Sequence, residues 1–333
     1  MSARNGQKLK LLYIIDILRK YSDEENPISA VKLCEMLAEL GISAERKAIY
    51  NDIDNLTFYG YDIVHTRVPK NGYFLASREF ELPEIYLLSD AIRSAPFISP
   101  KKSRELISKL DNMLSLNQQK KREKGIYINE NAKSLNEEIY YNIDTISSAI
   151  ENRLKITFKH GKKSLNENRE IVTTYKDMTV SPYALCWQDD YYYLIGNYSK
   201  YDNLIHLRLD RMKKVSVTDE SIRPFSEVSE YTEFFDTHDY TNKIFGMFGG
   251  DLQKIELTCS KDILEQVVDK FSDKIFIKNL TDTHFSFSAD VAISEALVTW
   301  ISNYADKITV KSPQTLIDMI TARAESIIKN YNH

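Results

Sequence analysis

One segment near the start of the chain decides the fold of its first domain, and it reads Gly41-Ile42-Ser43-Ala44-Glu45-Arg46-Lys47-Ala48-Ile49-Tyr50-Asn51-Asp52-Ile53-Asp54-Asn55-Leu56. Ile49, Ile53 and Leu56 recur at the spacing that places apolar residues on one face of a helix. Ser43 is positioned to cap that helix. The opposite face carries Arg46, Lys47, Tyr50, Asn51 and Asp54. The segment therefore predicts an amphipathic helix with a polar face.

Two further helices are predicted before this segment. Between Lys8 and Tyr21, apolar residues recur at helical spacing, namely Leu11, Leu12, Ile15 and Leu18. After the breaker Asn26-Pro27, Ser29 is positioned to cap a second helix, in which the pattern continues at Leu33, Cys34 and Leu37. Two helices joined by a tight turn at Gly41 have the spacing of a helix-turn-helix, whose second helix presents its polar face to the major groove of DNA.

A β-hairpin is predicted directly after the third helix. Strand-like runs at 62–68 and 73–75 flank Pro69-Lys70-Asn71-Gly72, and Asn-Gly favours a hairpin because both positions tolerate positive φ. This hairpin would be the wing of the domain. The charged face of the third helix could simply be solvated, but its place in a helix-turn-helix followed by a wing favours contact with DNA. Residues 1–80 are thus predicted to be a winged helix-turn-helix domain that binds double-stranded operator DNA through Ser43, Arg46, Lys47, Tyr50, Asn51, Arg67 and Lys70.

Composition limits the other classes of function. The 333-residue chain has a formal net charge of −4, and its first 75 residues hold as many acidic as basic side chains, so tight DNA binding should require a dimer. No apolar run approaches the roughly 20 residues of a membrane span, and the polar start lacks a signal peptide. We expect a cytoplasmic protein without a membrane partner.

Motifs for catalysis or metal binding are not found in the sequence. The three cysteines lie far apart, the six histidines lack metal-ligand spacing, and there is no glycine-rich nucleotide loop. Two aspartates at 189–190 are typical of a turn. We therefore expect no metal, no cofactor and no enzymatic activity.

The rest of the chain divides by periodicity. Residues 81–152 predict a helical linker, with a mobile polar connection at Asn117–Lys124 and helices at 82–94, 101–116 and 135–152. At Arg153 the period changes to 2, which predicts a small β-barrel or sandwich over 153–222 with strands near 153–159, 168–175, 178–187, 190–198, 203–209 and 213–218. Residues 223–333 alternate strands and helices and predict an α+β module, so the whole chain is multidomain α+β.

One predicted strand carries the candidate ligand site. Alternation places Ile205, Leu207 and Leu209 on one face and His206 with Arg208 on the other. The Arg208 guanidinium and the nearby Arg211 suit an anionic ligand, because arginine offers a planar fork of donors. Alternatively, Arg208 pairs with Asp210 or Asp190 in a surface network. Aromatic rings beside arginines suit stacking on bases, and one of Tyr191, Tyr192 and Tyr193 should border the pocket.

Several motifs resemble those of WYL-domain transcriptional regulators with a DeoR-like DNA-binding head. In the head the matching residues are Leu33-Cys34, Gly41-Ile42-Ser43, Lys47-Ala48-Ile49-Tyr50-Asn51-Asp52-Ile53 and Leu56, with Asn51 where the family has arginine. The family's Trp-Tyr-Leu is matched by Tyr192-Tyr193-Leu194. Its Phe-Arg-Leu-Asp-Arg-Ile is matched by Leu207-Arg208-Leu209-Asp210-Arg211-Met212, with Ser181-Pro182-Tyr183 upstream. The tail, with Leu297-Val298-Thr299-Trp300 and Val310-Lys311-Ser312-Pro313, looks like the family's C-terminal extension.

The resemblance implies an Sm-like β domain that senses a ligand, often a nucleic acid or nucleotide, and controls the head within a homodimer. The linker and the C-terminal extension are the expected dimer interfaces. Together with strand alternation, it predicts a pocket for an anionic ligand formed by Ser181, Tyr183, Tyr193, His206, Arg208 and Arg211. The predicted function is ligand-responsive, sequence-specific transcriptional regulation. The alternative, which Asn51 favours, is a nucleic-acid-sensing module without promoter-specific regulation.

Overall fold

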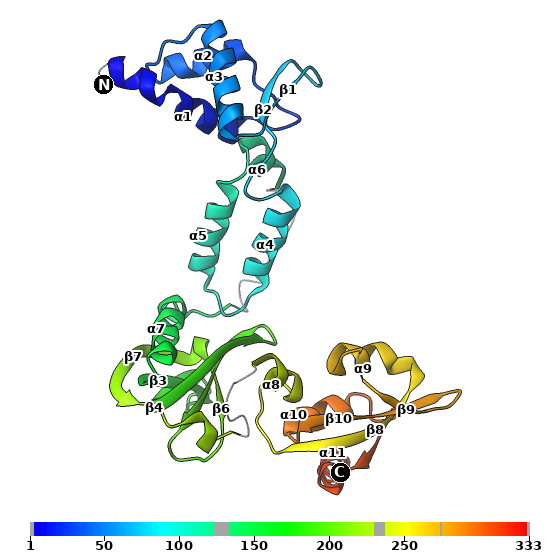
Figure 1. The fold of residues 1–333 in the computed structure, drawn as a ribbon. Helices are drawn as coiled ribbons and strands as arrows, with labels where there is room; N and C mark the ends of the chain where they lie inside the picture. The colour runs from blue at the N-terminus through cyan, green and yellow to red at the C-terminus, as the bar shows by residue number, and fades with distance from the viewer. Residues whose placement is uncertain (1–2, 123–132, 230–236, 274, 332–333) are drawn as a thin grey trace. The chain divides into compact units, whose positions relative to one another are not determined.

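The computed structural model describes residues 3–122, 133–229, 237–273 and 275–331 (Figure 1). The chain divides into two compact units, residues 1–135 and 136–333. Among the described residues, helices and strands both occur in each unit, which confirms the mixed α+β class. No helix in the described part of the chain is long and apolar enough to cross a membrane.

Three helices begin the first unit, α1 (Ala3–Tyr21), α2 (Ala30–Glu39) and α3 (Arg46–Tyr59). Ser29 caps α2 as predicted, since its hydroxyl accepts a hydrogen bond from the Lys32 N–H at 3.2 Å. Ser43 does not cap α3, because the helix starts later and its N-cap residue is Glu45. Leu12 is 57% exposed while Ile14 is fully buried, because the buried stripe of α1 runs through Ile14, Ile15 and Leu18.

A two-stranded hairpin completes the head, the name used here for α1–α3 and this hairpin. Strands β1 (Ile63–Thr66) and β2 (Gly72–Leu75) pair antiparallel around the predicted turn. The fully buried side chains of Leu33, Leu37 and Ile49 lie in the same core as Leu75. The three helices and the hairpin therefore share one hydrophobic core.

Helices α4 (Leu82–Ser94), α5 (Pro100–Asp111) and α6 (Leu116–Arg122) follow and are called the linker helices. The predicted mobile connection at 117–124 is wrong over 117–122, and residues 123–124 lie outside the described residues. Ser115 and Gln118 form a capping box: the Gln118 N–H donates to the Ser115 hydroxyl at 3.1 Å, and the Ser115 N–H donates to the Gln118 side-chain oxygen at 3.0 Å. This cap starts a helix in a segment whose composition indicated a loop.

The second unit begins with α7 (Ile139–Glu151), which packs on a five-stranded antiparallel sheet. The strand order is β6-β5-β4-β3-β7, with β3 (Leu154–Leu165), β4 (Ile171–Gln188), β5 (Tyr191–Tyr198), β6 (Ile205–Arg208) and β7 (Met212–Ser221). The two strands expected at 168–175 and 178–187 are one long strand, β4. Ile146 and Ala149 of α7 are fully buried, and the Asn142 side chain donates to the Met212 carbonyl at 3.1 Å.

The expected closed barrel is not formed by the described residues. Strands β6 and β7 are the two edges and do not pair, although only the 3-10 turn Leu209–Arg211 separates them in the chain. Leu209, the first residue of this turn, and Met212, which directly follows it, are fully buried. A three-residue turn therefore joins the two edge strands of the sheet, and the described sheet stays open.

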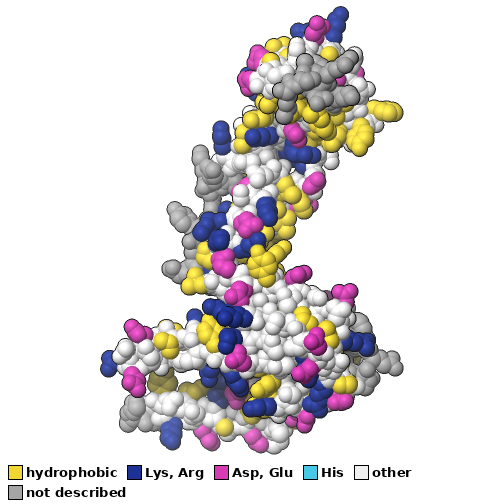
Figure 2. Space-filling view, turned by 90° about the vertical axis from the view of Figure 1, so that its left-hand side faces the viewer, with side chains coloured by type: hydrophobic (Ala, Val, Ile, Leu, Met, Phe, Trp, Pro, Cys, Tyr) yellow, Lys and Arg dark blue, Asp and Glu magenta, His cyan; other side chains and the backbone are white. Residues whose placement is uncertain are grey.

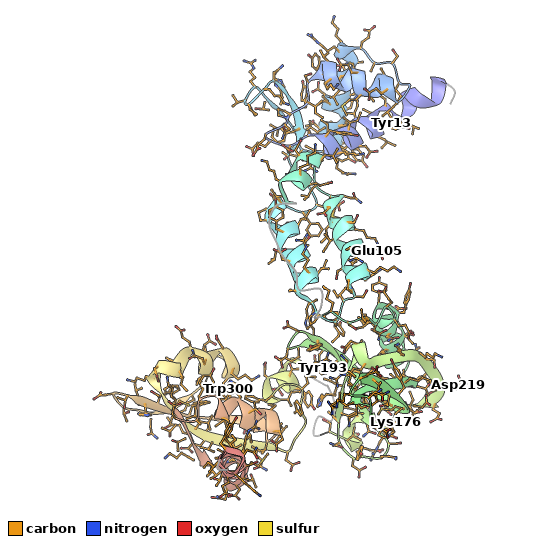
Figure 3. All side chains as sticks on the ribbon, turned by 180° about the vertical axis from the view of Figure 1, so that it is seen from behind. Tyr13, Glu105, Lys176, Tyr193, Asp219 and Trp300 are labelled. Carbon is orange, nitrogen blue, oxygen red and sulfur yellow. The ribbon has the colours of Figure 1, made fainter. Side chains whose placement is uncertain are left out.

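The remaining elements form an antiparallel sheet in the order β11-β8-β10-β9 with helices packed on it. The strands are β8 (Leu252–Ser260), β9 (Ile277–Leu280), β10 (His284–Ala292) and β11 (Ile308–Ser312), and the helices are α8 (Thr237–Lys243), α9 (Leu264–Phe271), α10 (Glu295–Ser302) and α11 (Gln314–Tyr331). Trp300 packs against the buried core of this part (Figure 3), which includes the fully buried Phe287 and Leu297. The predicted α+β alternation is confirmed here.

Candidate nucleic-acid interface and ligand site

The polar face of α3 is open to solvent. Arg46, Lys47, Tyr50 and Asn51 are all exposed, as is Ser43 before the helix, while Ile49 on the opposite face is fully buried. Within the described residues, neither Arg46 nor Lys47 forms an ion pair. The inward side of α3 is fixed to α1 by an ion pair of 2.7 Å between Lys10 and Asp52. The helix thus has the exposed donors and the rigid backing that contact with DNA requires. 

The hairpin faces the same region through an open groove of about 550 Å³. The groove is lined by Ala30, Tyr50, His65, Arg67, Asn71, Gly72 and Tyr73. Arg67 and Lys70, the predicted wing contacts, are both exposed. The His65 imidazole lies 2.9 Å from the Asn71 side-chain oxygen and packs on the Tyr73 ring at 4.8 Å. Sequence reasoning did not single out His65 or Tyr73, which join the groove only once the strands pair.

The hairpin is held against the start of α2. Tyr73 and Ile28 exchange backbone hydrogen bonds of 2.8 Å in both directions. At Gly72, an added Cβ would lie 2.7 Å from the carbonyl carbon of Ile28, so glycine permits this close approach. The groove is therefore preformed.

In the second unit, Arg208 is paired with Asp210. Its Nε and Nη2 donate to the two carboxylate oxygens at 3.0 and 2.7 Å, and its guanidinium carbon lies 3.2 Å from the centre of the Tyr191 ring. Burial lowers the pKa of Arg208, but the hydrogen bond and charge of Asp210 outweigh burial, so the pKa is raised. The sequence left open whether Arg208 pairs with an aspartate or is available to a ligand, and the structure contains the ion pair with Asp210. The aromatic ring that stacks on the Arg208 guanidinium is that of Tyr191.

His206 shares a face with Arg208, as alternation predicted, but that face is covered. In the pairing of β5 with β6, Ile195 lies opposite His206, and Ile195 is fully buried. The His206 Nε2 lies 2.9 Å from the Tyr240 hydroxyl of α8, with the two rings stacked at 5.7 Å. Burial lowers the pKa of His206 to about 4. His206 is therefore neutral near pH 7 and packed against α8.

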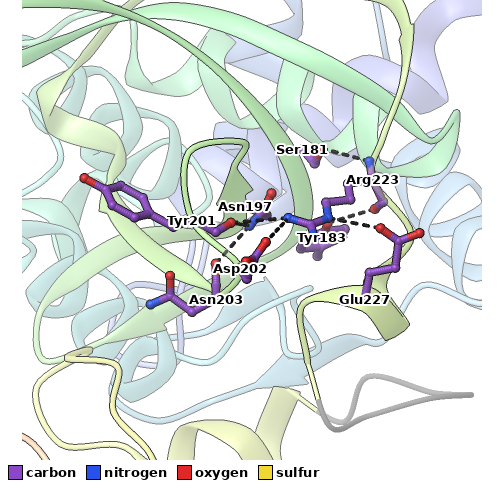
Figure 4. A network of polar contacts seen from close by, with 8 residues as sticks. All are labelled: Ser181, Tyr183, Asn197, Tyr201, Asp202, Asn203, Arg223 and Glu227. Carbon is purple, nitrogen blue, oxygen red and sulfur yellow. Dashed lines mark hydrogen bonds and ion pairs between the residues drawn. The ribbon is translucent and has the colours of Figure 1, made fainter.

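Ser181 and Tyr183 hold the chain that leaves β7 (Figure 4). The Ser181 hydroxyl accepts a hydrogen bond from the Arg223 N–H at 3.0 Å, and the Tyr183 hydroxyl donates to the Arg223 carbonyl at 2.8 Å. The Arg223 guanidinium in turn donates to Asp202 at 2.9 Å and Glu227 at 3.1 Å. Burial raises the pKa of Tyr183 to about 12. These contacts occupy both predicted pocket residues.

Arg211, in the turn that follows β6, is exposed to solvent. Arg211 forms no ion pair among the residues that the structure describes. The pKa of His160 is lowered, first by the burial of its ring and second by the positive charge of Arg211. Tyr193 is half-buried (Figure 3), and it lies opposite Arg208 in the pairing of β5 with β6. His160 was not predicted, because only the pairing of β3 with β7 brings it beside Arg211. No group of three metal-binding side chains is found in the described part of the chain.

Comparison with known families identifies one domain. Residues 141–217 match the family model of the WYL domain, a span that contains all six predicted pocket residues. Among solved structures, proteasome accessory factor B/C (PafBC) of Arthrobacter aurescens is similar, with 13% sequence identity over 97% of this chain and a TM-score of 0.27. The alignment covers 49% of that protein, so the chain spans about half its length. A comparison with curated protein sequences gives no match.

Proposed function

We propose that this protein is a ligand-responsive, sequence-specific DNA-binding transcriptional regulator. In this proposal the head is a winged helix-turn-helix, and the WYL-type domain senses an anionic ligand. The observation that carries it is the exposed polar face of α3 beside the preformed hairpin groove, with Arg46 and Lys47 unpaired among the described residues. The chain has no enzymatic role in this proposal.

DNA binding is tested with the full chain and DNA fragments that flank its gene. The double variant Arg46→Ala/Lys47→Ala should weaken binding of a selected fragment by about 1 to 3 kcal/mol per lost base contact, or roughly 5- to 150-fold. Lys162→Ala/Lys163→Ala is the matched control, because it removes two exposed positive charges from strand β3. Affinity is measured by fluorescence anisotropy at one fixed salt concentration.

The rival function gives a different result in the same assay. A nucleic-acid-sensing module without promoter function would bind all fragments alike, and both double variants would weaken binding to a similar extent. Equal affinity of the α3 double variant and the wild type would remove the head from DNA recognition. A monomeric mass at micromolar concentration, with and without DNA, would contradict the homodimer that we propose.

The ligand response is assigned to the surface around Arg211. Because Arg208 is already held by Asp210, an anionic ligand has to take the place of that carboxylate, whereas Arg211 is available at once. Ligand binding regulates DNA binding only if the ligand prefers one arrangement of the dimer over another.

A labelled ten-nucleotide oligothymidylate is the first probe of this surface. Arg211→Ala should weaken its binding about tenfold, equivalent to ~1.4 kcal/mol, while Lys163→Ala should change it little. Competition by inorganic phosphate alone would indicate a small anion as the ligand class, and competition by longer oligonucleotides alone would indicate a polymer. Equal binding by both variants would place the ligand site elsewhere.

A further inference from the structure

Arg78, between the hairpin and α4, contacts three backbone carbonyls from two separate segments. Its Nη1 donates to the carbonyl of Arg19 at 2.9 Å and to the carbonyl of Met113 at 3.1 Å. Its Nη2 donates to the carbonyl of Ser22 at 2.7 Å. Two of these carbonyls lie at the end of α1 in the head, and the third follows α5 of the linker helices. A single side chain thus bonds both parts of the first unit.

The positions of these carbonyls explain why an arginine stands there. Arg19 lies in the last turn of α1, Ser22 directly follows it, and Met113 follows the end of α5. Carbonyls at a helix C-terminus have no partner within the helix and carry the negative end of its dipole. The guanidinium therefore satisfies carbonyls at the end of α1 and, at the same time, a carbonyl just after the end of α5, because its planar fork of donors reaches several acceptors.

A second set of contacts joins the same two parts independently. The buried Ser115 hydroxyl, which begins α6, donates to the Asp23 carboxylate of the head at 2.5 Å. Lys121 of α6 forms an ion pair with Glu25. The turn after α1 is therefore fastened to α6 as well as to the end of α5, and Figure 1 shows α6 beside the head.

We propose that Arg78 is a positioning residue that, together with the contacts of Ser115 and Lys121, makes the head and the linker helices move as one rigid body. The inference deepens the proposed function, because it makes the orientation of α3 on DNA depend on the linker helices. A signal that moves these helices then turns the head, without any change within the head. The loss of Arg78 should leave the DNA-contacting surface intact and loosen its orientation.

The test is a distance measurement within the full chain. Spin labels are attached through a non-natural amino acid at Asn55 of α3 and Leu87 of α4, both exposed. Electron double resonance should give a narrow distribution for the wild type and one at least twice as wide for Arg78→Gln. Arg19→Gln is the matched control, because it removes an exposed guanidinium from the same end of α1 and keeps the carbonyl that Arg78 contacts.

Each outcome decides the proposal. Equal widths for Arg78→Gln and Arg19→Gln would overturn it. If Arg78→Gln does not unfold cooperatively, Arg78→Lys replaces it, and a distribution wider than that of Arg19→Gln supports the proposal while an equal one overturns it. The measurement needs no DNA, so a wild type with a narrow distribution and no affinity for any DNA would reject the proposed function and leave the joint standing.

Discussion

The polar face of α3 and the polar face of β6 were predicted by the same reasoning, yet they differ in the folded chain. On α3, Arg46 and Lys47 are exposed without ion pairs among the described residues. On β6, Arg208 is bound to Asp210 and stacked on Tyr191, and His206 is covered by Tyr240. Periodicity therefore identifies which side chains share a face, but not what covers that face.

The difference follows from where each element lies in its sheet or bundle. One face of α3 packs on α1 and α2, and its other face meets only solvent. Strand β6 belongs to a sheet that can be covered on both of its faces. The face that carries His206 is packed by residues 240–247, which are distant in sequence. On the face of the second unit seen in Figure 2, basic and acidic side chains are intermingled. The presence of an arginine or lysine in the sequence thus does not indicate whether its positive charge is available to a ligand in the folded chain.

The largest expected effect separates two arginines three residues apart. Arg208→Ala should lower the free energy of unfolding of the second unit by about 3 kcal/mol, because it leaves a largely buried carboxylate without a partner; the side chains of Arg208 and Asp210 are 21% and 13% exposed. Arg211→Ala should change it by less than about 0.5 kcal/mol. Urea unfolding followed by tryptophan fluorescence measures both. Equal losses would contradict the distinction between the bound and the free arginine.

A second expected effect depends on pH and reports the covered face. The pKa of His206, about 4, lies below its ordinary value, so the unfolded chain takes up the proton first as pH falls. Stability from this group is complete above pH ~6.5 and decreases as pH falls towards 4, by about 2 kcal/mol between pH 7 and 5.

His206→Gln is the matching variant for this pH effect. It should flatten the dependence of the melting temperature on pH over that range, leaving a remainder from His160, whose pKa burial also lowers. A variant with the wild-type pH dependence would show that Tyr240 does not keep His206 from water.

The third expected effect concerns a local contact that composition concealed. Ser115→Ala removes the hydroxyl that caps α6 and also donates to the Asp23 carboxylate, and it should destabilise the first unit by at least about 1 kcal/mol. Ser77→Ala, at an exposed serine of the same unit outside any described helix, serves for comparison. The unfolding of both variants is measured as the loss of circular dichroism at 222 nm during a urea titration. No difference between them would show that neither the cap of α6 nor the hydrogen bond to Asp23 contributes to the stability of the first unit.

The smallest expected effect completes the comparison. Arg46→Ala/Lys47→Ala should change the free energy of unfolding by no more than about 0.5 kcal/mol, because neither side chain is buried or paired in the described structure. Thermal unfolding gives this value in the same protein preparation used for DNA binding. A large loss of stability would mean that the positive charges of α3 serve the fold.

Local signals predicted the elements better than the site. Ser29, Gly41 and Asn71-Gly72 act on their immediate neighbours, so the helices and hairpin of the head follow from short segments. The helix predicted at 82–94 is α4, Leu82–Ser94. The open sheet was not predicted, because closure depends on whether β6 and β7 pair across the whole sheet.

The candidate site could be predicted only as far as one strand reaches. Alternation correctly placed His206 and Arg208 together, and the sequence already offered Asp210 as a partner for Arg208. It contained no signal for Tyr240, which reaches His206 from 34 residues further along the chain. Whether Arg211 and the α3 side chains bind ligand and DNA stays a prediction.

Gly72 has a consequence for how this protein tolerates sequence change. Any side chain there would approach three backbone atoms of Ile28 to within 2.7–2.9 Å, and backbone atoms cannot rotate away as a side chain does. In a saturation library selected for folded protein, position 72 should accept glycine alone, while the adjacent and exposed Asn71 accepts many residues. The position of the hairpin against Ile28 is thus inaccessible to single substitutions at Gly72, and sequence change is tolerated instead at the exposed residues of the neighbouring turn.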